Sequence, residues 1–383
     1  MPESAMTSLK THFADLPDPR VQHSIEHLLI DIVMLTICAV VCGAESWVEI
    51  ENYGLAKQEL LETFLELPNG IPSHDTIERV LARLRPEALQ QCFLNWVQAA
   101  FEISGGKLIA VDGKTLRGSY ERGGKQGMIH MVSAWAVQNR TVLGQRKVNE
   151  KSNEITAIPE LLGVLDLAGA IVSIDAMGCQ TAIAQQIVEQ QGDYVLALKG
   201  NQGSLFKDVV QLFDYARQQH FRGIEHDCYE TQEQAHGRTE IRRYWVMGQT
   251  GYLVSAENWA KLKTIGCVES QRQVGEQTTY ERRYYLLSLP LDARQFAQSV
   301  RGHWGIENQL HWILDVAFRE DQVRPTQGYS GENLAVIRHL ALNLLTQENS
   351  AKGGIRAKRL KAGWDDQYLL KVLAHSSSSS LQL

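Results

Sequence analysis

The stretch KLIAVDG at residues 107–113 decides how the chain folds, because an apolar run ends there on an acid and a glycine. Two further runs rich in branched and aromatic residues follow it, IHMVSAWAVQ at 129–138 and TVLGQRKV at 141–148. Turn-forming residues separate the three runs, which is typical of antiparallel strands joined in sequence. The sequence therefore predicts a three-stranded meander that begins near residue 107.

Downstream of the meander, predicted helices and strands alternate. A helical pattern covers 154–167, AIVSID forms a strand at 170–175, a second helix covers 181–190, and DYVLALK forms a strand at 193–199. This alternation is typical of a parallel α/β unit in which helices connect neighbouring strands. We therefore expect an α/β fold with a mixed sheet flanked by helices.

Upstream of the meander, the chain reads as helix almost throughout. Apolar residues recur at helical spacing from 25 to 104, with turns at LPNGIP (67–72) and Pro86. We expect residues 1–104 to form a separate all-α N-terminal domain.

One helix of this region has a basic face. Asp75 and Glu78 form a plausible capping box, after which Arg79 and Arg83 lie opposite an apolar stripe. This pattern suits the second helix of a helix-turn-helix, in which the two arginines would contact DNA. An amphipathic core helix with a solvated basic face gives the same pattern.

The remaining chain divides into two parts. A second domain is expected at 105–350, with a β-rich insertion of antiparallel strands at about 222–290. Helical patterns return after the insertion at 292–318 and 332–345. Residues 351–383 read as a basic segment followed by a disordered tail.

Composition excludes several classes of protein. The longest apolar run, 32–44, is shorter than the roughly 20 residues that cross a bilayer, so we expect no membrane segment and a cytoplasmic location. The six cysteines are scattered without a CxxC pair, which gives a zinc or disulfide framework no support. The net charge is −6, so a surface that binds nucleic acid must be local.

Two acids end predicted strands. Asp112 follows the apolar run of the first strand, and Asp175 follows that of AIVSID. A single Asp at a strand end is usually a turn residue, but two in equivalent positions weaken that interpretation. If the two strands are neighbours, both carboxylates meet at one edge of the sheet, where a cation would relieve their repulsion. Hard oxygen ligands of this kind select Mg²⁺ or Mn²⁺.

A third acid is expected from the helical segment RGHWGIENQLHWILDVAFRED at 301–321. Glu307 lies beside the apolar stripe of that helix and can point at the sheet edge. Asp315 lies eight positions later, about 12 Å along the axis, so one helix cannot offer both acids to the same metal pair.

The same helix allows two other interpretations. His303, Glu307 and His311 stand at i, i+4 and i+8, a spacing that fits a zinc site, although not in the HExxH order. Trp304 and Trp312 could stack on an unpaired base, but aromatic residues at helical spacing are more often core.

Together these motifs resemble the DDE transposases of bacterial insertion sequences, specifically the H-repeat-associated group. The resemblance covers nearly the whole chain and rests on HSIEHLLIDIVMLTICAVVCGAESWVEIENYG, GIPSHDTIERVL, AVDGKTLRGS, SIDAMGCQ, LALKGNQ and RGHWGIENQLHWILDVAFRED. It implies an RNase H-like catalytic domain in which Asp112, Asp175 and Glu307 hold Mg²⁺ or Mn²⁺. It also implies cleavage at the ends of an element, joining of the 3′-hydroxyl to target DNA, and a homodimer on double-stranded DNA.

The resemblance has one departure. The wider family often carries a Tyr-Arg-Glu-Lys signature around its last acid, and Val300, His303 and Leu314 occupy the other three positions here. The resemblance therefore carries over the acid of this helix but not its DNA contacts.

Candidate phosphate contacts lie near the acids. Lys114 and Arg117 follow Asp112, and Lys199 and Asn201 follow a strand expected at the same edge. His303, one turn before Glu307, is a further candidate for contact with DNA. An ordinary surface base explains each of the cations equally well.

Two other functions are compatible with these residues. The first is an RNase H-like nuclease that cuts DNA without strand transfer. The second is a transposase relic that binds DNA but is catalytically inactive, and the three intact acids count against it.

Overall fold

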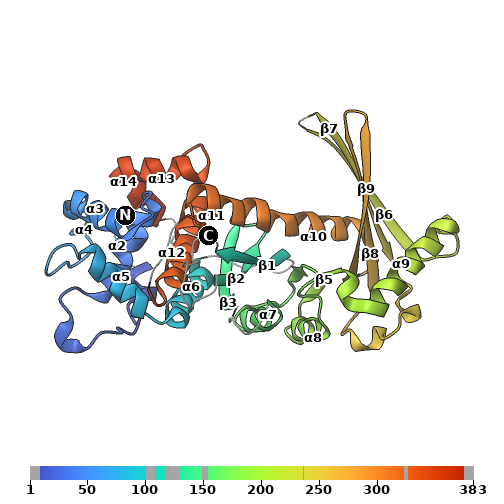
Figure 1. The fold of residues 1–383 in the computed structure, drawn as a ribbon, viewed down its shortest axis with the longest axis horizontal. Coiled ribbons are helices and arrows are strands. Elements are labelled where there is room, and N and C mark those ends of the chain that lie inside the picture. The colour runs from blue at the N-terminus through green and yellow to red at the C-terminus, as the bar shows by residue number, and fades with distance from the viewer. Residues whose placement is uncertain are drawn as a thin grey trace, which may run out of the picture.

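In the computed structural model, the first strands of the sheet lie in the middle of an elongated molecule (Figure 1). N-terminal helices lie at one end, and long β-hairpins project at the other. The structure describes residues 9–100, 108–116, 129–148, 154–235, 237–322 and 327–374.

A nine-stranded mixed sheet has the order β3-β2-β1-β4-β5-β9-β8-β7-β6. Its first five strands are β1 (Leu108–Leu116), β2 (Ile129–Ala136), β3 (Thr141–Val148), β4 (Ile171–Ile174) and β5 (Asp193–Leu198). The first three form the predicted antiparallel meander. β4 runs parallel to both β1 and β5, as the alternation of helices and strands predicted.

The predicted β-rich insertion extends this same sheet. It consists of β6 (His226–Ala235), β7 (Arg238–Met247), β8 (Thr264–Val274) and β9 (Gln277–Leu287). β9 pairs antiparallel with β5, and β6 is the far edge strand. Sequence analysis did not single out β6, because its exposed and half-buried residues are mostly polar and give no apolar alternation.

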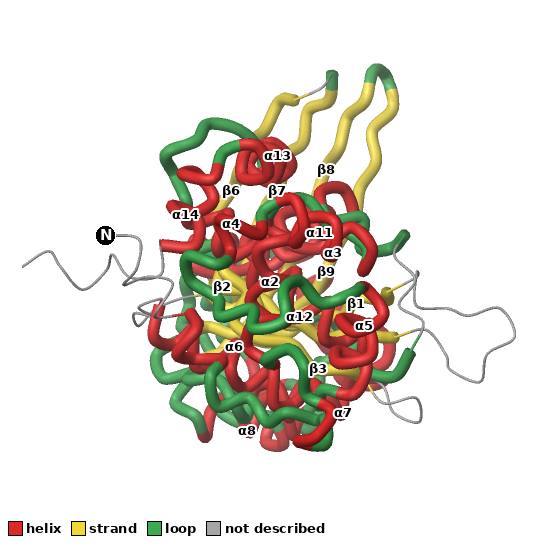
Figure 2. The backbone as a smooth tube through the Cα atoms, turned by 90° about the vertical axis from the view of Figure 1, so that its left-hand side faces the viewer, coloured by secondary structure: helices red, strands yellow, loops and turns green. Residues whose placement is uncertain are grey.

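Helices cover the two faces of the sheet, as the two views show (Figures 1 and 2). α7 (Glu154–Leu162) and α8 (Thr181–Glu189) lie on one face, and α10 (Ala293–Gly305) crosses the other. α9 (Gly203–Gln218) packs beside β9. The Asp292 side chain caps α10 by accepting a hydrogen bond from the Gln295 amide at 2.8 Å.

The segment that carries the third acid is not one regular α-helix. A π-helical stretch, Ile306–His311, separates α10 from α11 (Trp312–Ala317). A π turn inserts one residue into the helical repeat, and such turns are frequent at functional sites. The positions before and after it therefore do not keep the α-helical spacing assumed from the sequence.

The N-terminal helices surround α12 (Ser330–Gln347), which is almost wholly buried. They include α2 (Leu29–Val41), α3 (Trp47–Ala56), α4 (Gln58–Leu61), α5 (His74–Arg83) and α6 (Pro86–Ala100). Their apolar residues join those of α12 and of the sheet in one hydrophobic cluster. The two regions therefore share a core.

The start of α5 differs from the prediction. Its N-cap is Ser73, which accepts a hydrogen bond from the Thr76 amide at 3.4 Å, so the capping box expected at Asp75 does not form. Arg79 and Arg83 are exposed on this helix, while Ile77, Val80 and Leu81 are buried, as the amphipathic pattern predicted.

The basic segment after residue 350 is structured, contrary to a simple solvated run. It forms α13 (Ile355–Trp364) and α14 (Asp366–Ala374). Lys358 and Arg359 are buried and donate hydrogen bonds to backbone carbonyls, including those of Leu345 at 2.9 Å and Val40 at 3.1 Å. The predicted tail beyond residue 374 lies outside the described residues. No described helix is both long and apolar enough to span a membrane.

Candidate active site

The register between β1 and β4 brings two acids side by side. The parallel pairing ends at Val111 opposite Ile174, so Asp112 and Asp175 are the next residues on the two strands. Neighbouring strands lie about 4.8 Å apart, so the two carboxylates leave the sheet next to one another. β1 itself does not end at Asp112 as predicted. It continues to Leu116, paired only with β2.

The loop after Asp175 is fixed by local hydrogen bonds. Asp175 Oδ1 accepts bonds from the backbone amides of Met177 at 3.0 Å and Gly178 at 3.3 Å. Asn201 Nδ2 donates to the carbonyl of Ala176 at 2.7 Å. Asp175 is therefore also a turn residue. Both bonds use the same carboxylate oxygen, Oδ1. The bond from Asn201 supports the loop.

Glu307 lines the same cavity as the two aspartates. This cavity has a volume of roughly 430 Å³ and lies between β4, β5, β9 and α10. Glu307 is exposed to solvent and belongs to the π-helical stretch. The three acids proposed from the sequence therefore come together at one site.

The charges of neighbouring acids in the cavity raise the proton affinity of Asp112. Burial, and next to it the charge of Asp175, raise the pKa of Asp112 to about 7, and Glu307 and Glu154 act in the same direction. A divalent cation would relieve this repulsion, and a set of carboxylate oxygens suits Mg²⁺ or Mn²⁺. Within the described residues, no three His, Cys, Asp or Glu side chains converge tightly enough to hold a metal as they stand. The carboxylate oxygens are suitable ligands for a divalent metal. The side chains would have to move closer together for all three acids to bind it.

Glu154, at the start of α7, is an acid that sequence reasoning missed. Burial and the charge of Asp175 raise the pKa of its carboxylate. This carboxylate lies against Gly113, where any side chain would collide with it. An acid in the first turn of a helix is common, so the sequence carried no signal that distinguished this one.

Lys114 lies next to the acids but is engaged elsewhere. Its Nζ donates to Asp315 Oδ1 at 2.6 Å and to Glu320 Oε2 at 2.7 Å. Arg338 lies 3.8 Å from the second oxygen of Glu320. Both carboxylates raise the pKa of Lys114 against the opposing effect of burial. The ammonium expected to contact phosphate therefore belongs to a buried ion-pair network, and Asp315 is its partner.

The histidines of the α10 segment point to different partners. His303 Nδ1 lies 3.1 Å from Ser173 Oγ on β4, and burial lowers the pKa of this imidazole. His311 Nδ1 lies 3.6 Å from Asp112 Oδ2. Burial, then the charges of Lys114 and His339, lower the pKa of His311 to about 3. The zinc site considered from the sequence is therefore not assembled in the described part of the chain.

Trp304 lies in the cavity and not in the core. The guanidinium groups of Arg242 and Arg283 each lie 5.2 Å from the centre of its ring, and that of Arg301 lies 5.7 Å from it. Trp312 is 59% exposed. The expectation that both tryptophans are core residues is wrong, because Trp304 is half-buried in the wall of the cavity and Trp312 is exposed.

Of the other basic candidates, only some line the acidic cavity. Lys199 lines the acidic cavity. Arg79 and Arg83 lie on α5 in the N-terminal region and do not line it. Arg117 lies outside the described residues. Arg282 and Arg283 of β9 also line the cavity, although sequence analysis did not select them.

The chain matches the models of two known protein families. The model described as "DDE_Tnp_1-associated" matches residues 10–97, and the model described as "Transposase DDE domain" matches residues 103–344. The chain belongs to the DDE transposase family. The second match alone covers more than half of the transposase, including all three acids of the cavity.

Relatives of the transposase are similar over almost their whole length. "H repeat-associated putative transposase YhhI" of Escherichia coli K12 is 42% identical over 379 residues, which is 98% of this chain and 100% of that protein. "Putative transposase YncI" of E. coli O157:H7 is 43% identical over 97% of this chain and 96% of its own. The resemblance to the H-repeat-associated group is thereby confirmed.

A solved structure of a piggyBac transposase synaptic complex with hairpin DNA is also similar. It shares 10% identity over 100% of this chain and 82% of its own, with a TM-score of 0.45. Similarity at this level supports no argument about the site.

Proposed function

We propose that this transposase cleaves DNA at the ends of an insertion element and joins the released 3′-hydroxyl to target DNA by metal-dependent phosphoryl transfer. The observation that carries the proposal is the register of β1 and β4, which sets Asp112 beside Asp175. Glu307 reaches the same cavity from the opposite wall. Three acids from distant parts of the sequence thus share one site.

The proposal includes an RNase H-like core for the catalytic domain. It is supported by the order of the first five strands, β3-β2-β1-β4-β5, and by their directions. β1 lies centrally with an antiparallel partner on one side and a parallel partner on the other. The two aspartates then lie just beyond the paired segment of β1 and β4, and open sheets with parallel strands place their sites at such an edge.

In this proposal, Asp112, Asp175 and Glu307 hold Mg²⁺ or Mn²⁺. When bound, such ions activate the attacking oxygen and stabilise the leaving oxyanion. A water oxygen attacks the phosphodiester at the element's end, and the departing oxygen becomes the 3′-hydroxyl. That hydroxyl then attacks a target phosphodiester, so one P–O bond forms as another breaks.

Other residues of the cavity position these groups. The contact between His303 and Ser173 ties α10 to β4, and so holds the helix of Glu307 against the strand of Asp175. Lys199 and Arg283 line the cavity and are placed to bind the phosphates of the DNA. Lys114 acts indirectly, because its ammonium is buried between two carboxylates, and Asn201 does so because its amide supports the loop after Asp175.

The proposed partners are double-stranded element ends and target DNA, bound by a homodimer in the cytoplasm. Arg79 and Arg83 are candidates for contacts distant from the cavity, because both are exposed on one helix of the N-terminal region. Arg117 is retained as a candidate on its sequence position alone.

The test is an assay of the full chain on DNA that carries the inverted repeats flanking its gene. We expect both cut and joined products in Mg²⁺ or Mn²⁺, and neither in EDTA. Cutting without joining would favour the nuclease alternative. Binding of the DNA without metal-dependent products would favour an inactive relic.

A further inference from the structure

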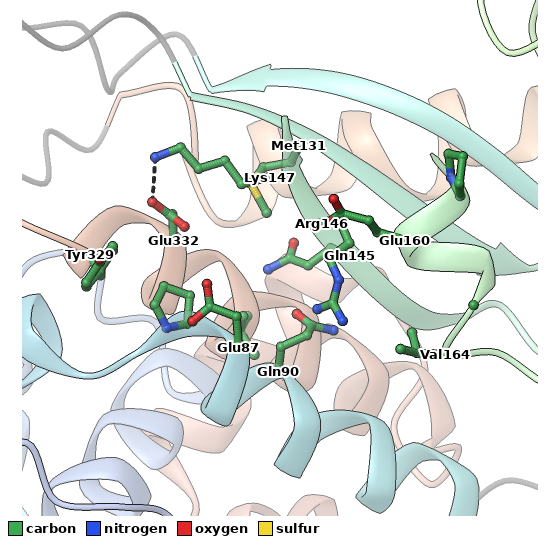
Figure 3. Close-up of a pocket in the computed structure, with 14 residues that line it drawn as sticks. Glu87, Gln90, Met131, Gln145, Arg146, Lys147, Glu160, Val164, Tyr329 and Glu332 are labelled. Atoms are coloured by element: carbon green, nitrogen blue, oxygen red, sulfur yellow. Dashed lines mark hydrogen bonds and ion pairs between the residues drawn. The ribbon is translucent and has the colours of Figure 1, made fainter. Parts of the chain in front are cut away.

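A second cavity opens at the free edge of β3 (Figure 3). It has a volume of roughly 670 Å³ and lies between β3, α6, α7 and α12. This volume is in the range of sites that bind small molecules or single groups of a larger ligand. None of the three acids assigned to catalysis lines this cavity.

Two glutamine side chains on its wall have buried amide atoms that find no hydrogen-bond partner in the described part of the chain. Gln90 of α6 is 3% exposed and Gln145 of β3 is 2% exposed. Neither the oxygen nor the nitrogen of the Gln145 amide has a hydrogen-bond partner among the described residues, and the same holds for the Gln90 nitrogen. Buried polar groups are nearly always paired, because leaving them unpaired costs folding free energy. These amides therefore indicate a ligand that pairs with them.

The walls around the amides define the shape and charge of that ligand. Figure 3 shows the Gln145 amide directed into the cavity, with Met131 beside it and the Tyr329 ring at the rim. Lys147 is neutralised by Glu332, 2.6 Å away. Side chains of both signs line the rest of the cavity, so it carries no strong net charge.

We propose that this cavity binds a nucleobase. The primary amide of Gln145 presents an acceptor and a donor side by side, which matches the paired donor and acceptor on the edge of a base. Gln90 supplies a further donor next to it. Tyr329, which is 45% exposed, offers an aromatic surface on which a planar ring can stack.

The cavity lies within reach of DNA bound at the acidic site. Gln145 pairs with Ser133, and Ser133 pairs with Asp112, so all three residues stand in one row across the sheet. Two strand spacings separate the ends of this row by about 10 Å. Two ligands present a nucleobase: the DNA substrate, through an unpaired base, and a free nucleoside. Binding of a base of the DNA substrate rests on the proposed function, and binding of a free nucleoside does not.

The test measures binding by the full chain in EDTA, so that no cleavage is read. The probes are the four deoxynucleosides and homopolymeric single-stranded 12-mers, titrated by calorimetry. We expect saturable binding of at least one probe, weakened about 5- to 150-fold in Gln145→Leu, the usual effect of losing one paired amide. Gln185→Leu is the matched control, because Gln185 is exposed on α8 and bonds only Glu189.

Each outcome decides the proposal. Binding of nucleosides alone assigns the cavity to a free ligand, and binding of 12-mers alone assigns it to a base in DNA. No saturable binding by the wild-type chain, or equal binding by Gln145→Leu, overturns the proposal. Without ligand, Gln145→Leu is expected to unfold at the same temperature or higher. A clearly lower temperature would show that the amide has a partner within the fold, and would also overturn it. If the wild-type chain does not cleave DNA, the proposed function fails, but the measured binding of nucleosides still tests the nucleobase proposal.

Discussion

Two groups of acids lie within the same part of the molecule and differ in one respect. The acids of the cavity, Asp112, Asp175 and Glu307, have no basic partner in hydrogen-bonding contact among the described residues, and burial and the charges of the other two raise the pKa of Asp112. Next to them, Asp315 and Glu320 share the ammonium of Lys114. Among the described residues, no ammonium or guanidinium group balances the first group at hydrogen-bonding distance, whereas Lys114 balances the second.

We interpret the cavity acids as ligand-binding residues, and Asp315 and Glu320 as residues that stabilise the fold. Removing a negative charge from the cavity relieves repulsion, whereas removing one from the network leaves buried positive charge with fewer carboxylates to balance it. Substitutions should therefore change activity in one group and stability in the other.

The largest expected effect is loss of cleavage on substitution of a cavity acid. Asp112→Asn and Asp175→Asn should each lower cleavage by several orders of magnitude, because the metal would lose a ligand. The free energy of unfolding in EDTA should not fall for Asp112→Asn. Cleavage is measured on labelled element ends and stability by urea denaturation. If either variant were unfolded or fully active, the cavity acids would not differ from the Lys114 network in the way we propose.

The next effect is loss of stability in the Lys114 network. Glu320 is 3% exposed and faces Lys114 and Arg338, so Glu320→Gln leaves buried positive charge unpaired. We expect the free energy of unfolding to fall by about 3–5 kcal/mol. Glu281→Gln is the control, because its ion pair with Arg283 is exposed and should contribute at most about 1 kcal/mol. Equal effects of the two substitutions would contradict the assignment of Glu320 to the fold.

Glu348 sharpens the comparison, because neutral donors stabilise its charge. Although burial opposes the shift, hydrogen bonds from Ser350 and Tyr368, the latter at 2.7 Å, lower the pKa of Glu348 from 4.5 to about 2. A lowered pKa in the folded state stabilises the protein above pH 4.5, and this contribution is lost as the pH falls towards 2.

Glu348→Gln should therefore destabilise the chain by roughly 3 kcal/mol at neutral pH, and hardly at all near pH 2. Urea denaturation across this range measures the difference between the two proteins. A difference that does not change with pH would show that the charge of Glu348 has no role.

The sequence predicted the part of the fold in which apolar periodicity is strong. The strands that carry Asp112 and Asp175 are buried, so their apolar runs stand out. The register that sets the two acids side by side follows from pairing between distant strands, so sequence analysis could state it only on the condition that the two strands are neighbours, or as an implication of the family resemblance. β6 escaped notice because a projecting hairpin needs no apolar face.

Other features depend on contacts that no local pattern records. The apolar residues around Glu307 recur at α-helical spacing in the sequence, so a regular helix was expected where the structure has a π turn. Lys358 and Arg359 look like a solvated basic run, but carbonyls from other helices bury them. Lys114 looked like a phosphate ligand because its acidic partners lie about 200 positions away in the chain.

The central claim is that Glu307, and not Asp315, completes the acidic site. The most direct measurement compares joining of labelled element ends to target DNA by Glu307→Gln and Asp315→Asn, at equal protein concentration in Mg²⁺. Glu307→Gln should bind DNA but join it slower by several orders of magnitude, because the metal would lose a ligand. Asp315→Asn should join nearly as well as the wild type, since Lys114 retains Glu320. Near-normal joining by Glu307→Gln together with an inactive Asp315→Asn would contradict the account and transfer the third acid to Asp315.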